Sequence, residues 1–356
     1  MTNRTPHGTA QGKPVEQVTL THGALTAKLI TFGARLTELW VPGRDGNLAD
    51  IVLGFDTLPE YEATETYFGA TCGRYGNRIR KGKFALDGVP HQVDCNEHGN
   101  HLHGGVDGFD HKIWSIADLT DTSVVFTALS ADGEMGFPGR ANLRATYTLT
   151  DGGLSVVMEA DTDSATVMNM VHHSYFNLAG QGSGDVLAQM IRLNAAFYTP
   201  VDDELLATGE VLSVKGTAFD FTTAKPIGRD IAALPGVGAE IFGDGGGYDH
   251  NWCLGDAGHI LREAATAWDP ASGRKMTLTT TEPGVQFYTG GYLSPAHNGK
   301  AGATLCKYAG FTLETQKFPD APNFAHFPHC RLNPGETYRQ EMHFTFTTCT
   351  ETGDDL

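Results

Sequence analysis

Basic residues and long apolar segments are both scarce in this sequence. Its 356 residues include 25 lysines and arginines against 42 aspartates and glutamates, which gives a formal net charge of −17. A chain of this charge repels phosphate backbones and anionic lipid surfaces, so we expect neither a nucleic-acid nor a membrane partner. No stretch reaches the roughly 18 consecutive apolar residues that a transmembrane helix needs. The composition favours a neutral small molecule as the partner.

Cysteine pairs with metal-site or redox spacing are also missing. The six cysteines are scattered along the chain, and none forms a C-x-x-C pair. The first residues, Met1 to Pro14, are polar and contain no apolar segment of the kind found in signal peptides. Reduced thiols and the lack of a signal peptide together predict a cytoplasmic protein.

Helix signals are few, and the motifs of nucleotide-binding folds are lacking. The sequence shows no βαβ rhythm, no G-x-G-x-x-G after a strand and no P-loop. A short helix is expected at Leu58–Ala63 and a turn around Ile227–Leu234. The hydrophobic content of 40% is nevertheless ample for a large core.

The sequence is rich in strand and turn signals. Its 44 glycines and 16 prolines separate short runs that are rich in Val, Thr, Phe and Tyr, and Asp-Gly pairs lie between many of these runs. Alternating strands joined by such turns are typical of antiparallel hairpins. We therefore predict an all-β fold, a large antiparallel β-sandwich with few short helices. The expected strand runs are Ala24–Trp40, Ser123–Leu129, Ala141–Leu149, Leu154–Ala160, Lys275–Thr281 and Tyr338–Thr347.

No proline-rich or charged linker divides the chain into separate units. We expect a flexible N-terminal tail over residues 1–14, a single β-sandwich domain over residues 15–350 and an acidic tail over residues 351–356. The loosest internal segment, Asp244-Gly245-Gly246-Gly247, is interpreted as a loop within that domain.

Glu314 is the first candidate catalytic residue. It lies at the end of the apolar run Gly310–Leu313, and the proline-rich turn of Phe318 to Asn323 follows it closely. A carboxylate held at a strand end beside a rigid loop can act as a general base whose position is fixed by the scaffold. An exposed glutamate at a strand end is the simpler alternative.

Five further clusters combine polar side chains with glycine or aromatic residues. Glycine allows close approach of a ligand, Arg and Asn donate hydrogen bonds to hydroxyls, and a histidine can give and take protons near neutral pH. Strand alternation implies that only one of the adjacent His172 and His173 enters a given pocket. The clusters are Gly73–Ile79, Asn96–Gly105, Met170–Gly180, Tyr248–Trp252 and Pro283–Gly290.

Three histidines within six residues, His98, His101 and His103, raise the question of a metal site. His101 and His103 would point the same way on a strand. A cupin-like site would also need a nearby glutamate, and Asp107 is a poor substitute. A histidine that contacts a sugar without a metal is the preferred interpretation, so no metal is expected.

These clusters together resemble the aldose 1-epimerase (galactose mutarotase) family over nearly the whole chain, from about Gly33 to Thr347. The motifs stand in the family's order: G-R-x-x-N-R-I, N-x-L-H-G-G, H-S-Y-F-N-L, D-H-N, P-G-x-Q-x-Y-T-G, L-E-T-Q-x-x-P-D-x-P-N and P-G-E-x-Y. The resemblance implies a galactose mutarotase-like supersandwich. It also implies an isomerase that interconverts the α and β anomers of a free aldose without a cofactor, as a monomer or weak homodimer.

The resemblance also implies roles for individual residues. Glu314 would be the catalytic base and His173 the catalytic acid. An ionised Glu314 and a protonated His173 predict a bell-shaped pH profile with limbs near ~4–5 and ~6–7, each shifted by its surroundings. The residues expected to bind the sugar are Asn77, Arg78, His103, Asp249 and Gln286.

Three positions depart from the family's usual residues, namely Gly76 for Ala, His172 for Asn and Gly291 for Asn. They put the sugar preference in question but not the reaction. Three alternatives stay open: a hexose-phosphate 1-epimerase, a non-catalytic sugar-binding protein on the same fold, and a metal-dependent isomerase built on the three clustered histidines.

Overall fold

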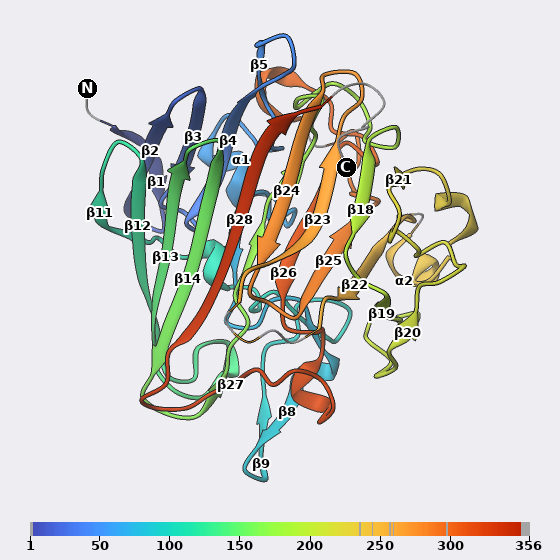
Figure 1. Ribbon diagram of the computed structural model, residues 1–356. Coiled ribbons are helices and arrows are strands. Elements are labelled where there is room, and N and C mark those ends of the chain that lie inside the picture. The colour runs from blue at the N-terminus through green and yellow to red at the C-terminus, as the bar shows by residue number, and fades with distance from the viewer. Residues whose placement is uncertain are drawn as a thin grey trace.

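The computed structural model describes residues 3–234, 236–243, 245–255, 258, 260–296 and 298–349. Antiparallel strands make up most of its regular structure, which confirms the predicted all-β class (Figure 1). The largest sheet has nine strands, which run in the spatial order β11 (Ser115–Leu119), β12 (Ser123–Ser130), β13 (Ala141–Thr150), β14 (Gly153–Thr162), β28 (Tyr338–Thr348), β24 (Arg274–Thr280), β23 (Arg262–Trp268), β18 (Met190–Leu193) and β21 (Lys225–Pro226).

Two further sheets complete the main architecture. A five-stranded sheet consists of β1 (Arg4–Ala10), β2 (Lys13–His22), β3 (Leu25–Ile30), β4 (Arg35–Pro42) and β5 (Leu48–Asp50). A six-stranded sheet consists of β17 (Tyr175–Phe176), β26 (Phe311–Gln316), β25 (Gly284–Tyr288), β22 (Asp249–Cys253), β19 (Phe197–Thr199) and β20 (Leu212–Ser213).

Short elements connect these sheets. Four two-stranded ladders pair β7 (Arg78–Ile79) with β10 (His101–Leu102), β16 (Val171–His173) with β6 (Ala70–Cys72), β15 (Thr166–Val167) with β27 (Arg331–Leu332), and β8 (Lys83–Leu86) with β9 (Val89–Gln92). The α-helices are α1 (Leu58–Glu62) and α2 (Ala239–Phe242). Single 3₁₀ turns lie at Arg80–Gly82, Phe109–His111, Glu134–Gly136, Ile231–Ala233, Lys300–Gly302 and Ala321–Asn323.

Residue alternation explains how the nine-stranded sheet contributes to the core. In β13, Leu143, Ala145 and Tyr147 are buried, while Asn142 and Arg144 between them are exposed. One face of such a strand packs inward and the other meets solvent. Most of the buried apolar residues of the three large sheets join one hydrophobic cluster. The single domain over residues 15–350 stays a prediction, with which this shared core agrees.

Predicted and observed elements differ at two places. The flexible tail expected over residues 1–14 is wrong for Arg4–Ala10, which pairs with β2 as the edge strand β1, although its side chains are mostly exposed. The expected run Ala24–Trp40 is two strands, because the chain reverses at Gly33 and Ala34, both with positive φ. The segment around Ile227–Leu234 holds a 3₁₀ turn, and the acidic tail 351–356 lies outside the described residues.

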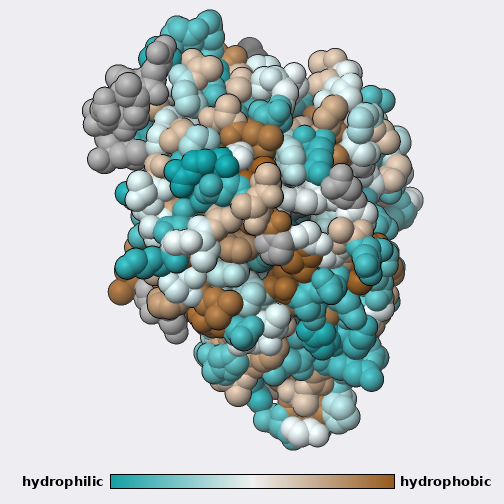
Figure 2. Space-filling model, turned by 90° about the vertical axis from the view of Figure 1, so that its right-hand side faces the viewer, coloured by the Kyte–Doolittle hydropathy of each residue, from teal (hydrophilic) through white to brown (hydrophobic). Residues whose placement is uncertain are grey.

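Exposed large apolar side chains are scattered over the described surface. Figure 2 shows hydrophobic atoms interspersed among hydrophilic ones on the side of the molecule that lies to the right in Figure 1. Phe197 on β19 and Leu212 on the edge strand β20 are among the exposed apolar residues. Within the described part of the chain, no helix has the length and apolar character that crossing a membrane requires.

Candidate active site

The candidate site begins with two strands that are buried on both faces. Every residue of β25 and β26 is buried. Alternation sends Phe287 and Leu313 into the hydrophobic core, so Gln286 and Glu314 point to the opposite side. The antiparallel register places Gln286 directly across from Glu314. A row of polar side chains is thereby buried on one face of the six-stranded sheet.

His173 reaches Glu314 from a separate strand. It ends β16, and its Nε2 lies 3.5 Å from Oε1 of Glu314, with both side chains nearly fully buried. The neighbouring His172 points elsewhere, with its Nε2 2.8 Å from the Ser174 hydroxyl and its ring against Tyr147. Only one of the two adjacent histidines therefore faces the carboxylate, as strand alternation predicted.

His103 and Asn77 come from two loops that cross at the ladder of β7 and β10. Both have positive φ, of 50° and 63° respectively. The backbone N–H of Asn77 donates to Nδ1 of His103 at 3.2 Å, which leaves Nε2 of a neutral His103 as the protonated nitrogen. The rings of His103 and His173 are 5.0 Å apart between centroids, so His103 presents an N–H donor beside His173 and Glu314.

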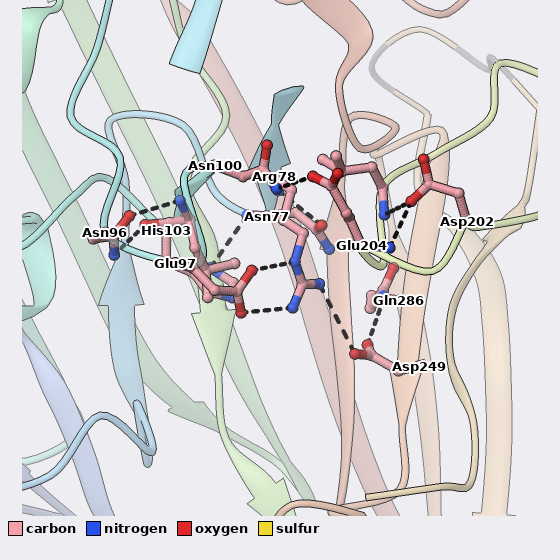
Figure 3. A network of polar contacts seen from close by, with 12 residues as sticks. Asn77, Arg78, Asn96, Glu97, Asn100, His103, Asp202, Glu204, Asp249 and Gln286 are labelled. Atoms are coloured by element: carbon pink, nitrogen blue, oxygen red, sulfur yellow. Dashed lines mark hydrogen bonds and ion pairs between the residues drawn. The ribbon is translucent and has the colours of Figure 1, made fainter. Parts of the chain in front are cut away.

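Arg78 connects the crossing loops to the sheet (Figure 3). Its Nε and Nη2 donate to the two carboxylate oxygens of Glu97 at 2.5 and 2.8 Å, and its Nη1 lies 3.9 Å from Oδ2 of Asp249. Asp249 in turn accepts a hydrogen bond from Nε2 of Gln286 at 2.7 Å. These contacts fix the carboxylate of Asp249 and the amide of Gln286 next to each other.

All seven residues that the sequence singled out line one pocket of about 590 Å³. This volume lies within the range of small-molecule sites. Aromatic side chains form part of its wall, including Tyr67, Tyr175 and Tyr288, and α2 contributes Ile241 and Phe242. The pocket thus combines apolar surface with converging polar groups.

Burial shifts the pKa values of both His173 and Glu314 in the direction that favours the neutral form. Removal from water raises the pKa of Glu314 to about 8, assisted by the negative charge of Asp249 and opposed by a hydrogen bond from Thr312. Burial lowers the pKa of His173 to about 3. Near pH 7 the pocket therefore holds a neutral carboxylic acid beside a neutral imidazole, where ordinary pKa values had predicted an ionised glutamate and a protonated histidine.

The three clustered histidines do not assemble into a metal site. His101 does not line the pocket. Its Nδ1 lies 2.8 Å from the Asp94 carbonyl oxygen, and its Nε2 accepts a hydrogen bond from the Gly104 N–H. The expectation that His101 and His103 point the same way is wrong, because β10 ends at Leu102. Among the described residues, ligand atoms that could share a metal ion come together at His103, His173 and Glu314. The N–H that His103 directs there does not suit a metal ligand.

Two residues that contact the site were not predicted. Glu97 lies within the cluster Asn96–Gly105 but was given no role. Gln316 donates from Nε2 to Oε1 of Gln286 at 3.2 Å. Gln316 lies two residues after Glu314 on the same strand, so alternation could have found it. The pairing of Glu97 with Arg78 depends on a contact between loops, for which the sequence offers no local signal.

The comparisons with known proteins point to one family. A family model described as aldose 1-epimerase matches residues 16–345. The chain belongs to the aldose 1-epimerase family. It is 41% identical to galactose mutarotase from Bos taurus over 333 residues, covering 94% of each chain, and 33% identical to aldose 1-epimerase from Escherichia coli over 350 residues, covering 97% of this chain and 99% of that one.

A solved structure of this family has the same fold as this chain. An aldose epimerase homologue from C. elegans superposes with a TM-score of 0.84 at 30% identity, over 94% of this chain and 99% of that one. The predicted galactose mutarotase-like fold is therefore confirmed.

Proposed function

We propose that this protein is an aldose 1-epimerase in which Glu314 and His173 open and close the ring of a free aldose. The observation that carries the proposal is the position of these two groups, 3.5 Å apart in the wall of one pocket. They come from β26 and β16, about 140 residues apart in sequence, so their approach is a product of the fold. Asn77, Arg78, His103, Asp249 and Gln286 line the same pocket and supply donors and acceptors for hydroxyls.

The chemistry requires one proton to leave and another to arrive. Glu314 takes the proton from the anomeric O1, and the electrons of that O–H bond form the C1=O1 double bond. The C1–O5 bond breaks, and O5 keeps its electron pair and takes a proton from His173. Rotation about C1–C2 exposes the other face of the aldehyde, and closure with reversed proton transfers gives the other anomer. Each positioned transfer contributes a factor of roughly 10²–10⁴.

The proton count of the buried pair fits this cycle. An ionised Glu314 with a protonated His173, and a neutral Glu314 with a neutral His173, hold the same single proton. The ionised form of the pair starts the ring opening, and the neutral form is left once the ring is open. The neutral pair that burial favours therefore corresponds to the open-chain stage. The cycle needs only a shift of this proton within the pair, with no net exchange with solvent.

The charges of the pocket favour a free sugar over a sugar phosphate. Four acidic side chains line the pocket, and Arg78 is the sole lysine or arginine among the described lining residues. The guanidinium of Arg78 is already paired with Glu97. A dianionic phosphate would meet this excess of negative charge without a free cation to bind it.

Polarimetry tests the proposed function. Freshly dissolved α-D-galactose or α-D-glucose should reach its equilibrium rotation much faster with the protein than in buffer alone. The corresponding 6-phosphates should gain little. A protein that binds galactose in calorimetry without accelerating the change in rotation would be a sugar-binding module, and faster turnover of the phosphates would identify a hexose-phosphate 1-epimerase.

A further inference from the structure

We propose that Glu97 is a positioning residue of this site: it holds Arg78 against the pocket wall and balances its charge, which leaves Asp249 available for a sugar hydroxyl. This inference rests on the proposed function. Arg78 is 7% exposed, and two of its guanidinium nitrogens are bound by the carboxylate of Glu97. A two-point contact of this kind fixes the plane of the guanidinium.

The backbone around Glu97 is built to hold it in place. Glu97 and Asn100 exchange backbone hydrogen bonds across a tight turn, with N···O distances of 3.0 and 2.8 Å. The side chain of Asn100 donates to Glu204 at 2.8 Å and accepts the Lys81 N–H at 2.8 Å. The turn is therefore tied both to the loop that carries Glu204 and to the segment that follows β7. Figure 3 shows Asn100 and Glu204 in the same network of polar contacts as Arg78 and Glu97.

Phe242 on α2 covers the ion pair from outside. The guanidinium carbon of Arg78 lies 5.7 Å from the centroid of the Phe242 ring, and the same ring packs edge-on against His98 at 4.8 Å. His98 is the residue after Glu97 in the turn. The side chains of Arg78 and Glu97 are thus only 8% and 16% exposed. Such shielding from water strengthens the pair and makes the loss of one partner costly.

The third guanidinium nitrogen of Arg78, Nη1, explains why the pairing with Glu97 matters to the reaction. Nη1 stands 3.9 Å from Oδ2 of Asp249, too far for a hydrogen bond. Without the negative charge of Glu97, the guanidinium is attracted to Asp249, and the carboxylate of Asp249 is then occupied by Arg78 instead of by a hydroxyl. Glu97 therefore keeps the two groups apart.

The charge balance also reaches Glu314. The positive charge of Arg78 lowers the pKa of Glu314, whereas Asp249 raises it. The titratable side chains that face Glu314 come from several elements: His173 on β16, Tyr175 on β17, Cys72 on β6, Asp249 on β22, Arg78 on β7 and His103 after β10. Of these, Arg78 alone carries a fixed positive charge. Removing the negative charge of Glu97 leaves the positive charge of Arg78 less balanced, so Arg78 should lower the pKa of Glu314 further.

The test compares Glu97→Gln with Glu97→Asp in polarimetric kinetics across pH. We expect Glu97→Gln to raise KM about 10-fold and to move the alkaline limb of the pH profile down by roughly 0.5–1 pH unit. Glu97→Asp keeps the charge but loses the two-point geometry, so it should raise KM while leaving the limb in place. Glu65→Gln removes a negative charge from an exposed position at the pocket and should not move the limb.

The outcomes separate this inference from the proposed function. An unchanged KM and limb in Glu97→Gln would overturn the positioning role, and so would a fall in kcat alone. Should Glu97→Gln not fold, a wild-type KM in Glu97→Asp would overturn it equally. Galactose binding is measured by calorimetry in parallel. A wild-type protein that binds galactose without turnover would refute the epimerase, while weaker binding by Glu97→Gln would still support the role of Glu97.

Discussion

Two buried pairs of an acidic and a basic side chain in this protein differ in how completely their hydrogen bonds are satisfied. Lys300 lies under the five-stranded sheet, and its Nζ donates to Oδ2 of Asp50 at 2.5 Å and to the carbonyls of Thr37 and Val52 at 2.5 and 2.9 Å. Asp50 also accepts the backbone N–H of Leu39 at 2.9 Å. Every strong donor of the ammonium group has a partner within the protein.

The pair of His173 and Glu314 is equally buried but incomplete. Oε1 of Glu314 accepts from Thr312 at 2.8 Å, whereas Oε2 has no hydrogen-bond partner among the described residues. A bound hydroxyl would satisfy that oxygen. The comparison distinguishes an ion pair whose hydrogen bonds are satisfied within the protein from a pair of titratable groups that leaves one oxygen for a ligand.

The largest expected effect comes from removing the proposed base. Glu314→Gln keeps the shape of the neutral acid but cannot accept the O1 proton, so kcat should fall by at least about 10³-fold. The free energy of unfolding should be retained, because the native carboxyl is already neutral near pH 7. Polarimetry and urea denaturation measure the two quantities, and Thr312→Val serves as a control that removes the neighbouring donor but leaves the carboxyl. Near-wild-type turnover in Glu314→Gln would remove the base assignment.

The opposite pattern is expected at the satisfied cluster. Asp50→Asn leaves the ammonium group of Lys300 buried without its counter-charge and should lower the free energy of unfolding by about 3–5 kcal/mol. The activity of each folded molecule should be unchanged, since neither residue lines the pocket. Asp118→Asn on the exposed face of β11 is the matched control and should change stability by less than about 0.5 kcal/mol. Equal stability of the two variants would show that the Lys300 cluster does not hold the fold.

The contrast between these clusters marks the limit of what the sequence could predict. The strand and turn pattern was enough to predict the all-β fold, and the resemblance carried by the order of motifs singled out seven of the residues that line the pocket. Burial could not be read in the same way, because it depends on loops that are distant in sequence. For that reason the protonation of Glu314 and His173, the role of Glu97 and the contribution of α2 were not predicted.

The pH dependence of activity sharpens this difference. Because burial raises the pKa of Glu314 to about 8 and lowers that of His173 to about 3, the pair carries one proton between those values. Above pH 8 the pair loses its proton and no acid remains for O5, so kcat/KM should fall about 10-fold per pH unit. Rates are corrected for the buffer-catalysed change in rotation at each pH. An alkaline limb near pH 6–7 would contradict the buried, neutral pair.

The smallest effect concerns the wall of the pocket rather than its charges. Gly291 stands where the resemblance led us to expect Asn, and a Cβ there would lie 2.0 Å from the carbonyl oxygen of Gly246. Gly291→Ala must displace this backbone contact, which lies close to Asp249 in sequence. We expect a loss of about 1–3 kcal/mol in the free energy of unfolding and a KM raised a few-fold.

Gly236→Ala supplies the control for that substitution. A Cβ at Gly236 meets no atom within 4 Å, and its φ is not positive, so the substitution should be neutral or slightly stabilising. Urea denaturation and galactose kinetics on both variants separate the close contact from a general effect of replacing glycine. If Gly291→Ala matched Gly236→Ala in both measurements, the loop of Gly245 and Gly246 would adapt without cost, and the departure at position 291 would have no structural consequence for the sugar site.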